Sequence, residues 1–237
     1  LLDEFNVTHA ILTGWLNASA MQEGWVEFKT ALMSAYNDWL VEHWLERDER
    51  LYGSVQVNSW DAEAAAREID RMAEHPRIVQ VMLYSGYEAF GAPRYHPIFE
   101  AAERHGLVVH VHTSPGAASD IDEVGHLVEW YADRVAVHLV HFGGGASGHI
   151  KLAGSRFFDW IAAGKRVYTD LSWAIGFAPY WLAEEIERRG IGHDRVLFAS
   201  DRPWGDFAGE HARMTAAFGD GALGARVFRD TFAALYD

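Results

Sequence analysis

The chain has 237 residues, of which 49% are hydrophobic, and its 20 basic residues stand against 34 acidic ones, for a net charge of -14. This length suits one large domain with a sizeable core, and the acidic balance argues against nucleic acid as a partner because phosphate binding needs clustered Lys and Arg. The absence of cysteine excludes disulfides and thiolate metal sites and favours a cytoplasmic protein, and no apolar run is long enough to predict a membrane span or membrane partner.

Seven short apolar runs predict β strands. They cover residues 7–12, 51–57, 78–84, 107–112, 135–141, 166–170 and 196–200. Amphipathic patterns between them predict helices over 31–47, 61–74, 97–105 and 178–189. Asp61 is a candidate N-cap, and Gly106 and Gly190 are candidate C-caps. Residues 13–30 follow neither pattern and are expected to form a loop.

The alternation of strands and helices predicts an α/β fold with a parallel sheet. An open doubly wound sheet could stop at seven strands, whereas a closed (β/α)8 TIM barrel needs eight. Residues 1–5 read as helical directly before the first strand. We therefore expect a TIM barrel whose N-terminal first strand is not part of the sequence. No linker or repeat divides the chain, so residues 1–237 are expected to form a single domain.

Three of the predicted strands end in side chains that can bind a metal or transfer a proton. The run 107–112 ends at His112, the run 135–141 ends at His141, and Asp201 follows the run 196–200. The carboxyl ends of parallel strands form the active face of a barrel. Imidazole and carboxylate groups suit a divalent metal that activates water. We interpret His112 as a metal ligand and Asp201 as a metal ligand and proton acceptor, although Asp201 could also cap the next helix.

Two other histidines have less specific interpretations. His110 is two residues from His112, so both could bind one metal, but a hydrogen-bonded polar side chain inside the barrel is the favoured interpretation. His138 and His141 are three residues apart and should point to opposite faces of a strand. We expect His138 to face the helices or to bond a backbone group.

Further candidates lie after the strand predicted at 166–170. Asp170 is its last residue and is as well explained by a turn or cap as by a substrate contact. Trp173 and Trp204 follow strand ends and could form the wall of a pocket for a planar or apolar substrate. The glycines after Phe142 allow a close backbone approach but lack the pattern of a phosphate-binding loop.

Four strings of the sequence resemble the amidohydrolase-2 family, which includes aminocarboxymuconate semialdehyde decarboxylase and its relatives. They are HGLVVHVHTSPG, VAVHLVHFGGG, VYTDLSW and DRVLFASDRPWGD, and they occur in the family's order. The resemblance covers the chain from about residue 51 onward and implies a metal-dependent (β/α)8 barrel. It implies that His112 is the metal ligand ending strand 5, that His141 is the catalytic histidine ending strand 6, and that Asp201 is the metal ligand and proton shuttle ending strand 8.

The family's ligand pair on strand 1 has no match in the sequence. The string from His110 to His112 is not that pair, because three candidate strands precede it. We expect the pair to precede Leu1, so the sequence holds two of the family's four ligands. The expected ion is Zn²⁺, with Mn²⁺ as the alternative, since both accept imidazole and carboxylate ligands. No cofactor other than the metal is expected.

Three functions are compatible with these residues. The first is hydrolysis of a small-molecule amide, ester or lactone by metal-activated water, with His141 and Asp201 as the catalytic groups. The second is nonoxidative decarboxylation of an aromatic or unsaturated carboxylic acid at the same site. The third is a barrel without catalysis that binds a partner. A small molecule is the expected ligand, and a homodimer is the assembly that the family suggests.

Overall fold

The structure is a computed structural model that describes residues 1–14, 25–84, 88–113, 120–143, 156–174 and 176–236. The chain divides into two compact units, one formed by 1–87 with 92–110 and the other by 88–91 with 111–237. Each unit combines strands with helices, so the α/β class is confirmed. No helix in these described ranges is both long and apolar enough to cross a membrane.

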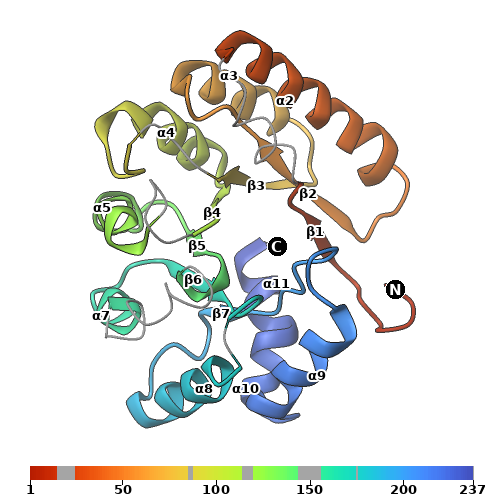
Figure 1. Ribbon diagram of the computed structural model, residues 1–237, viewed down its shortest axis with the longest axis vertical. Helices are drawn as coiled ribbons and strands as arrows, with labels where there is room; N and C mark the ends of the chain where they lie inside the picture. The colour runs from red at the N-terminus through yellow and green to blue at the C-terminus, as the bar shows by residue number, and fades with distance from the viewer. Residues whose placement is uncertain (15–24, 85–87, 114–119, 144–155, 175, 237) are drawn as a thin grey trace. The chain divides into compact units, whose positions relative to one another are not determined.

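The first unit contains a parallel sheet covered by helices. Its strands are β1 (Ala10–Leu12), β2 (Leu51–Gln56) and β3 (Ile78–Leu83), and they pair in chain order. Its helices are α2 (Val26–Leu40), the π-helix η1 (Val41–Leu45), α3 (Ala62–Met72), the short 3-10 helix η2 (Pro93–Tyr95) and α4 (His96–His105). The long helices lie along one side of the strands (Figure 1). Strand β4 (Val108–Val111) leads from this unit into the second.

The helix boundaries in the first unit follow the predicted caps. The Asp61 side chain accepts a hydrogen bond from the Ala64 backbone N–H at 2.9 Å and so begins α3. Gly106 ends α4 in the left-handed conformation, with φ of 67°. On α3 the buried residues are alanines together with Ile69 and Met72, which is the apolar face that the spacing predicts.

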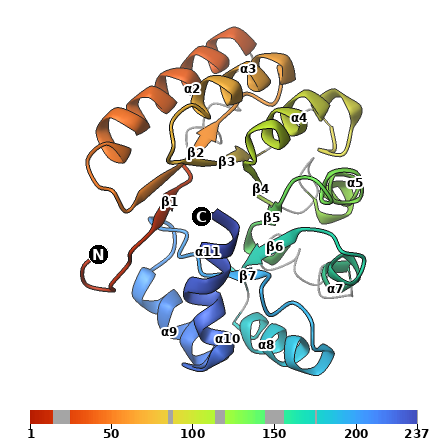
Figure 2. The ribbon, with the colours of Figure 1, turned by 180° about the vertical axis from the view of Figure 1, so that it is seen from behind.

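The second unit repeats the pattern of strand and helix. Its strands β5 (Val137–Leu139), β6 (Val167–Asp170) and β7 (Val196–Leu197) are parallel and pair in chain order. Its helices are α5 (Ile121–Tyr131), α7 (Phe157–Ala162), α8 (Ala178–Arg189), α9 (Phe207–Phe218), α10 (Ala222–Ala225), the π-helix η4 (Arg226–Asp230) and α11 (Thr231–Tyr236). In the two opposite views, α7 and α8 lie on one side of the strands and α11 lies on the other (Figures 1 and 2).

Several predicted boundaries are wrong, each for a local reason. Strand β7 ends at Leu197 rather than at residue 200, because the Phe198 N–H donates to the Val227 carbonyl of η4 at 3.0 Å instead of to a neighbouring strand. Strand β5 ends at Leu139, two residues before His141, whose backbone is left-handed. Residues 2–6 form turns, where a helix is expected over 1–5, and 26–30 begin α2 rather than a loop; of that expected loop, 15–24 lie outside the described residues.

The number of strands agrees with the sequence. The described ranges contain seven strands, at the seven places where apolar runs predict them. A closed barrel of eight strands remains a prediction. The single domain expected over residues 1–237 likewise stays a prediction.

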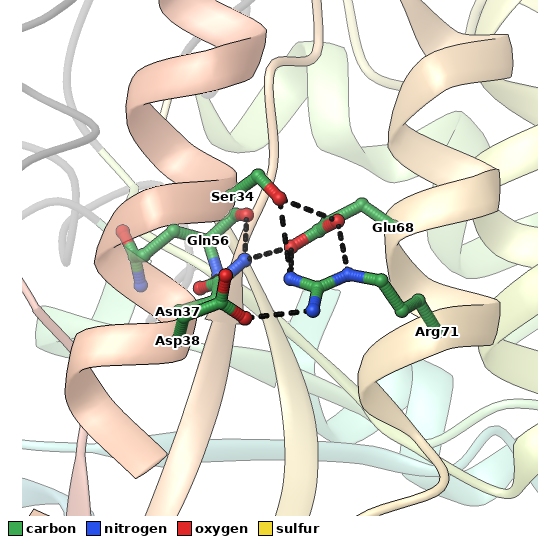
Figure 3. Close-up of polar contacts among 6 residues, drawn as sticks. All are labelled: Ser34, Asn37, Asp38, Gln56, Glu68 and Arg71. Carbon is green, nitrogen blue, oxygen red and sulfur yellow. Dashed lines mark hydrogen bonds and ion pairs between the residues drawn. The ribbon is translucent and has the colours of Figure 1, made fainter. Parts of the chain in front are cut away.

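A buried asparagine joins three elements of the first unit (Figure 3). Asn37 on α2 is fully buried; its Nδ2 donates to the Gln56 carbonyl of β2 at 2.9 Å and to Oε1 of Glu68 on α3 at 2.7 Å. Its Oδ1 accepts from the Gln56 N–H at 2.9 Å. Arg71 completes the cluster from outside by pairing with Glu68 and with Asp38, both at 2.7 Å. The side chain of Asn37 thus satisfies backbone groups at the end of β2 that would otherwise be buried without partners.

Replacement of Asn37 by Ala should lower the free energy of unfolding by about 3 kcal/mol, because it leaves buried donors and acceptors unsatisfied. The matched control is Asp38→Ala, which breaks only the Arg71 pair, whose side chains are 44% and 62% exposed. That change should cost less than about 1 kcal/mol. Urea unfolding of both variants measures the difference, and equal losses would show that Asn37 does not carry the junction.

Candidate active site

The carboxylate of Asp170, the last residue of β6, is the centre of a buried polar cluster. Its Oδ2 lies 3.0 Å from Nε2 of His138 on β5. Its Oδ1 accepts hydrogen bonds from the Ser172 hydroxyl, from the Ser172 backbone N–H at 2.9 Å and from the His141 backbone N–H at 3.4 Å. Asp170 is 0% exposed. One side chain therefore joins the ends of two neighbouring strands.

Asp170 stays ionised in this environment. Burial by itself would raise the pKa of Asp170, but the hydrogen bonds from His138 and Ser172 and the charges of His138 and His141 hold that pKa well below its usual range. A buried charge is tolerated when its partners satisfy it, and removal of one partner is then costly. The interpretation of Asp170 as a turn residue is the one that its bond to the Ser172 N–H supports.

His141 follows β5 in a backbone conformation that few residues adopt. His141 and Phe142 have φ of 59° and 49°. Nδ1 of His141 lies 2.9 Å from the carbonyl oxygen of Ser172 and 2.9 Å from its hydroxyl oxygen. A carbonyl oxygen only accepts, so Nδ1 carries the hydrogen, and Nε2 of the neutral ring keeps a lone pair for a proton or an ion.

His112 lies beside His141, as the sequence predicts. The centroids of their rings are 5.0 Å apart, and the ring planes are nearly perpendicular at 88°. The backbone holds them there, because the Val140 N–H donates to the Val111 carbonyl at 3.0 Å and the Thr113 hydroxyl donates to the Val140 carbonyl. Burial, followed by the charge of His141, lowers the pKa of His112 to about 4. His112 is therefore neutral at pH 7 and has a lone pair to offer.

Asp201 lies four residues beyond the end of β7, in a tight loop. Its φ is 51°, and its carbonyl accepts from the Gly205 N–H at 2.7 Å. A Cβ on Gly205 would come within 2.0 Å of the Ser200 carbonyl oxygen, so this loop requires glycine there. Burial raises the pKa of Asp201, the charges of Asp170 and Glu210 raise it further, and the charge of His141 opposes them. Asp201 is thus closer to its protonated form than an exposed aspartate.

The structure brings some of the predicted site residues together but does not assemble a complete metal site from the residues that it describes. His112 and His141 are ring neighbours, and Asp201 is electrostatically linked to His141. Among the residues that the structure describes, no three His, Asp or Glu side chains are grouped closely enough to hold a metal. The roles of His112, His141 and Asp201 as ligand, catalytic base and shuttle therefore remain proposals.

The remaining histidine predictions have mixed outcomes. His110 is 7% exposed on β4, so it is buried, and its expected place inside a barrel stays a prediction. His138 has a partner that the sequence does not predict, the Asp170 carboxylate at 3.0 Å; its expected orientation towards the helices stays a prediction. Sequence reasoning also missed Ser172. An Asp at a strand end with Ser two residues later was the available signal, since an aspartate often binds the N–H two residues ahead of it.

Trp173 projects beside the cluster from a rigid turn. It is 59% exposed, its φ is 59°, and its ring centroid lies 6.3 Å from that of His141. The turn is held by a bond from the Ala174 N–H to the Leu171 carbonyl at 3.1 Å. The guanidinium of Arg213 also donates to the Ala174 carbonyl at 3.3 Å and to the Leu171 carbonyl at 2.6 Å. Backbone strain at a bulky exposed residue is typical of functional sites. Trp204 is 57% exposed on the loop after Asp201.

Comparison with protein families gives one match that covers most of the chain. The sequence model described as amidohydrolase matches residues 15–237. Comparison with curated protein sequences finds no match.

Solved structures of similar fold include decarboxylases and a hydrolase. The 5-carboxyvanillate decarboxylase of Sphingomonas paucimobilis has a TM-score of 0.77 at 19% identity, covering 99% of this chain and 80% of that one. A dihydroxybenzoic acid decarboxylase of a Polaromonas species, with bound manganese and the inhibitor 2-nitroresorcinol, has a TM-score of 0.78 at 18% identity, covering 99% and 83%. A probable 2-pyrone-4,6-dicarboxylic acid hydrolase of Acinetobacter baumannii has a TM-score of 0.65 at 16% identity, covering 99% and 85%. At these identities the likeness shows a shared fold, which is consistent with the predicted TIM-barrel type.

The lowered pKa of His112 predicts a pH-dependent stability in the metal-free protein. The unfolded chain takes up a proton at His112 near pH 6.5, whereas the folded chain does so near pH 4. Between these values the unfolded state binds more protons, so the contribution of His112 to stability is full above pH 6.5 and is lost as the pH falls to 4.

Replacement of His112 by Gln should therefore flatten the decline of the unfolding free energy over this range, by about 1–3 kcal/mol. His126→Gln is the matched control, because the His126 side chain is 61% exposed on α5. Urea titrations at several pH values measure both. A wild-type slope retained in His112→Gln would contradict the assignment.

Proposed function

The chain belongs to the amidohydrolase family of enzymes, and on that premise we propose that it is a divalent-metal-dependent decarboxylase of an aromatic or unsaturated carboxylic acid. The observation that carries the proposal is the edge-on contact of the His112 and His141 rings after neighbouring strands, with the carboxyl of Asp201, whose pKa is raised, electrostatically linked to His141. Groups whose environments push their protonation in different directions are what acid–base chemistry at neutral pH needs. The fold shared with two aromatic-acid decarboxylases supports this choice over the hydrolase that the sequence suggests first.

The donor groups at the site suit a divalent ion. His112 offers a neutral nitrogen, and Asp201 offers carboxylate oxygens, so both are compatible with Mn²⁺ as well as Zn²⁺. Manganese in the similar Polaromonas enzyme makes Mn²⁺ the first ion to test. When bound, the ion supplies positive charge that holds the substrate's carboxylate or a neighbouring hydroxyl group.

The residues of the chain supply the proton transfer. In decarboxylation the bond between the ring carbon and the carboxylate breaks, its electron pair stays on the carbon, and a proton must replace the departing carbon dioxide. Asp201 is the proposed donor, because burial and the charges of Asp170 and Glu210 raise its pKa, so its carboxylate takes up a proton more readily than an exposed aspartate does. The lone pair on Nε2 of His141 lets the imidazole take a proton from a substrate hydroxyl or from water and pass it to Asp201, which has given its own proton to carbon.

Trp173 is proposed to bind the planar part of the substrate. Its ring is exposed and lies beside His141 on a turn fixed by Arg213. An aromatic face held in place costs little conformational entropy when a second ring stacks on it, and such a pair contributes about 1 kcal/mol beyond the area it buries. This feature favours an aromatic acid over a saturated one.

Hydrolysis is the second candidate function. The observation that favours it is the fold shared with a probable hydrolase of a dicarboxylic acid. The same His141 and Asp201 would then activate water instead of delivering a proton to carbon. Release of carbon dioxide without incorporation of labelled solvent oxygen distinguishes decarboxylation from hydrolysis.

The cytoplasmic location and the homodimer expected from the sequence remain proposals.

Asp201→Asn should lower kcat for carbon dioxide release by a factor of about 100 or more, since an amide cannot transfer the proton. Asp206→Asn is the matched control: it makes the same chemical change five residues later, where Asp206 caps α9 by accepting from the Gly209 N–H at 2.9 Å. Asparagine also caps helices, so activity should be retained. The assay uses manganese-loaded protein and hydroxybenzoic acids, and unchanged turnover in Asp201→Asn would refute the role of Asp201.

Trp173→Ala should raise KM for an aromatic acid by about fivefold to tenfold with little change in kcat, because a stacking contact made throughout the reaction is uniform binding. Trp173→Phe should keep most of the affinity. Trp130→Ala, which removes a 49% exposed tryptophan from α5, is the control. Steady-state kinetics of the three variants decide the matter; equal KM values in Trp173→Ala and Trp130→Ala would remove Trp173 from the site.

A further inference from the structure

The hydroxyl of Ser172 lies between the ring of His141 and the carboxylate of Asp170. Its oxygen is 2.9 Å from Nδ1 of His141, and its hydrogen is donated to Oδ1 of Asp170. Ser172 is 2% exposed and Asp170 is 0% exposed, so water does not compete for these bonds. The cluster connects the end of β6 to the imidazole after β5.

The direction of each hydrogen bond in the series from Asp170 through Ser172 to His141 follows from the one before it. The ionised carboxylate of Asp170 can only accept, so the Ser172 hydroxyl donates to it. The hydroxyl oxygen then presents lone pairs to Nδ1 of His141, as does the Ser172 carbonyl oxygen at 2.9 Å. Two acceptors facing one ring nitrogen require that this nitrogen carry the hydrogen.

Asp170 has little freedom to release this arrangement. Its second oxygen is bound by Nε2 of His138 at 3.0 Å, and its first also accepts from the backbone N–H groups of Ser172 and His141. Rotation of the carboxylate would break several buried bonds together. The hydroxyl of Ser172 therefore has a fixed, charged acceptor.

We propose that Asp170 and Ser172 are positioning residues that hold His141 as the Nδ1–H tautomer and so keep Nε2 as its proton-accepting nitrogen. This inference rests on the proposed function for its consequence in catalysis, but the tautomer itself is a property of the metal-free protein. Partners behind a functional imidazole commonly change activity by about 10–100-fold when removed.

The tautomer can be read directly by ¹⁵N NMR of the histidine rings in the full chain without metal. The spectrum of His141→Gln assigns the His141 signals by their loss. We expect a protonated Nδ1 and an unprotonated Nε2 in the wild type at neutral pH. The Nδ1–H fraction should fall in Ser172→Ala, which keeps only the carbonyl acceptor, and further in Asp170→Asn.

Thr169→Val is the matched control on the same strand. It removes another fully buried hydroxyl, which lies 2.7 Å from the Leu139 carbonyl oxygen and 3.1 Å from the backbone carbonyl oxygen of Asp170, and which is bonded neither to His141 nor to the Asp170 carboxylate. It should lower stability and leave the His141 tautomer unchanged. Ser172→Thr keeps the hydroxyl and should restore the wild-type spectrum. If Asp170→Asn fails to fold, Ser172→Ala still carries the test.

Kinetics add a second readout. Ser172→Ala should lower kcat by about tenfold or more and change KM by less than about twofold, whereas Thr169→Val should change neither. A wild-type His141 protonated at Nε2 would overturn the proposal, and so would a tautomer that responds equally to Ser172→Ala and Thr169→Val. If the tautomers behave as expected but no carbon dioxide is released, the positioning role stands and only the proposed function fails.

Discussion

The ionised carboxylate of Asp170 is the constraint on which the rest of the site depends. A charge without access to water persists only if nearby donors replace its hydration. The donors here come from His138 on β5, from the backbone after β5 and from the turn after β6. The same bonds that satisfy the charge therefore fix the position of His141 and Ser172. The structural requirement of the core and the geometric requirement of the site are met by one group.

Strain and electrostatics are concentrated at the same strand ends. Of the five non-glycine residues with positive φ in the described ranges, four follow β5, β6 or β7: His141, Phe142, Trp173 and Asp201. Such conformations cost about 1–3 kcal/mol each and persist where surrounding bonds impose them. Burial lowers the pKa of His112 and raises that of Asp201, so the environment shifts each group towards its uncharged form. Such a site can bind a metal ion through the neutral nitrogen of His112, and Asp201 can still deliver a proton to the substrate carbon.

Much of this arrangement could be predicted from the sequence because it depends on local patterns. Apolar runs located the seven strands, Asp61 marked the start of a helix, and strand-end positions singled out His112 and His141 as neighbours. The role of Asp170 could not be predicted, because it depends on which side chains meet it across the sheet. The pattern of spacing also cannot show that the Phe198 N–H bonds a helix carbonyl, which ends β7 early. Tertiary contacts decide the partners of Asp170 and the end of β7, and the spacing of apolar residues along the sequence does not record those contacts.

The proposed function requires that His112 and Asp201 bind one divalent ion beside His141, at the carboxyl ends of the strands. Anomalous diffraction from crystals of the protein soaked with Mn²⁺ tests this most directly. We expect one strong manganese peak at bonding distance from a ring nitrogen of His112 and a carboxylate oxygen of Asp201. A strong peak bound elsewhere, or no peak at these two side chains at saturating Mn²⁺, would contradict it.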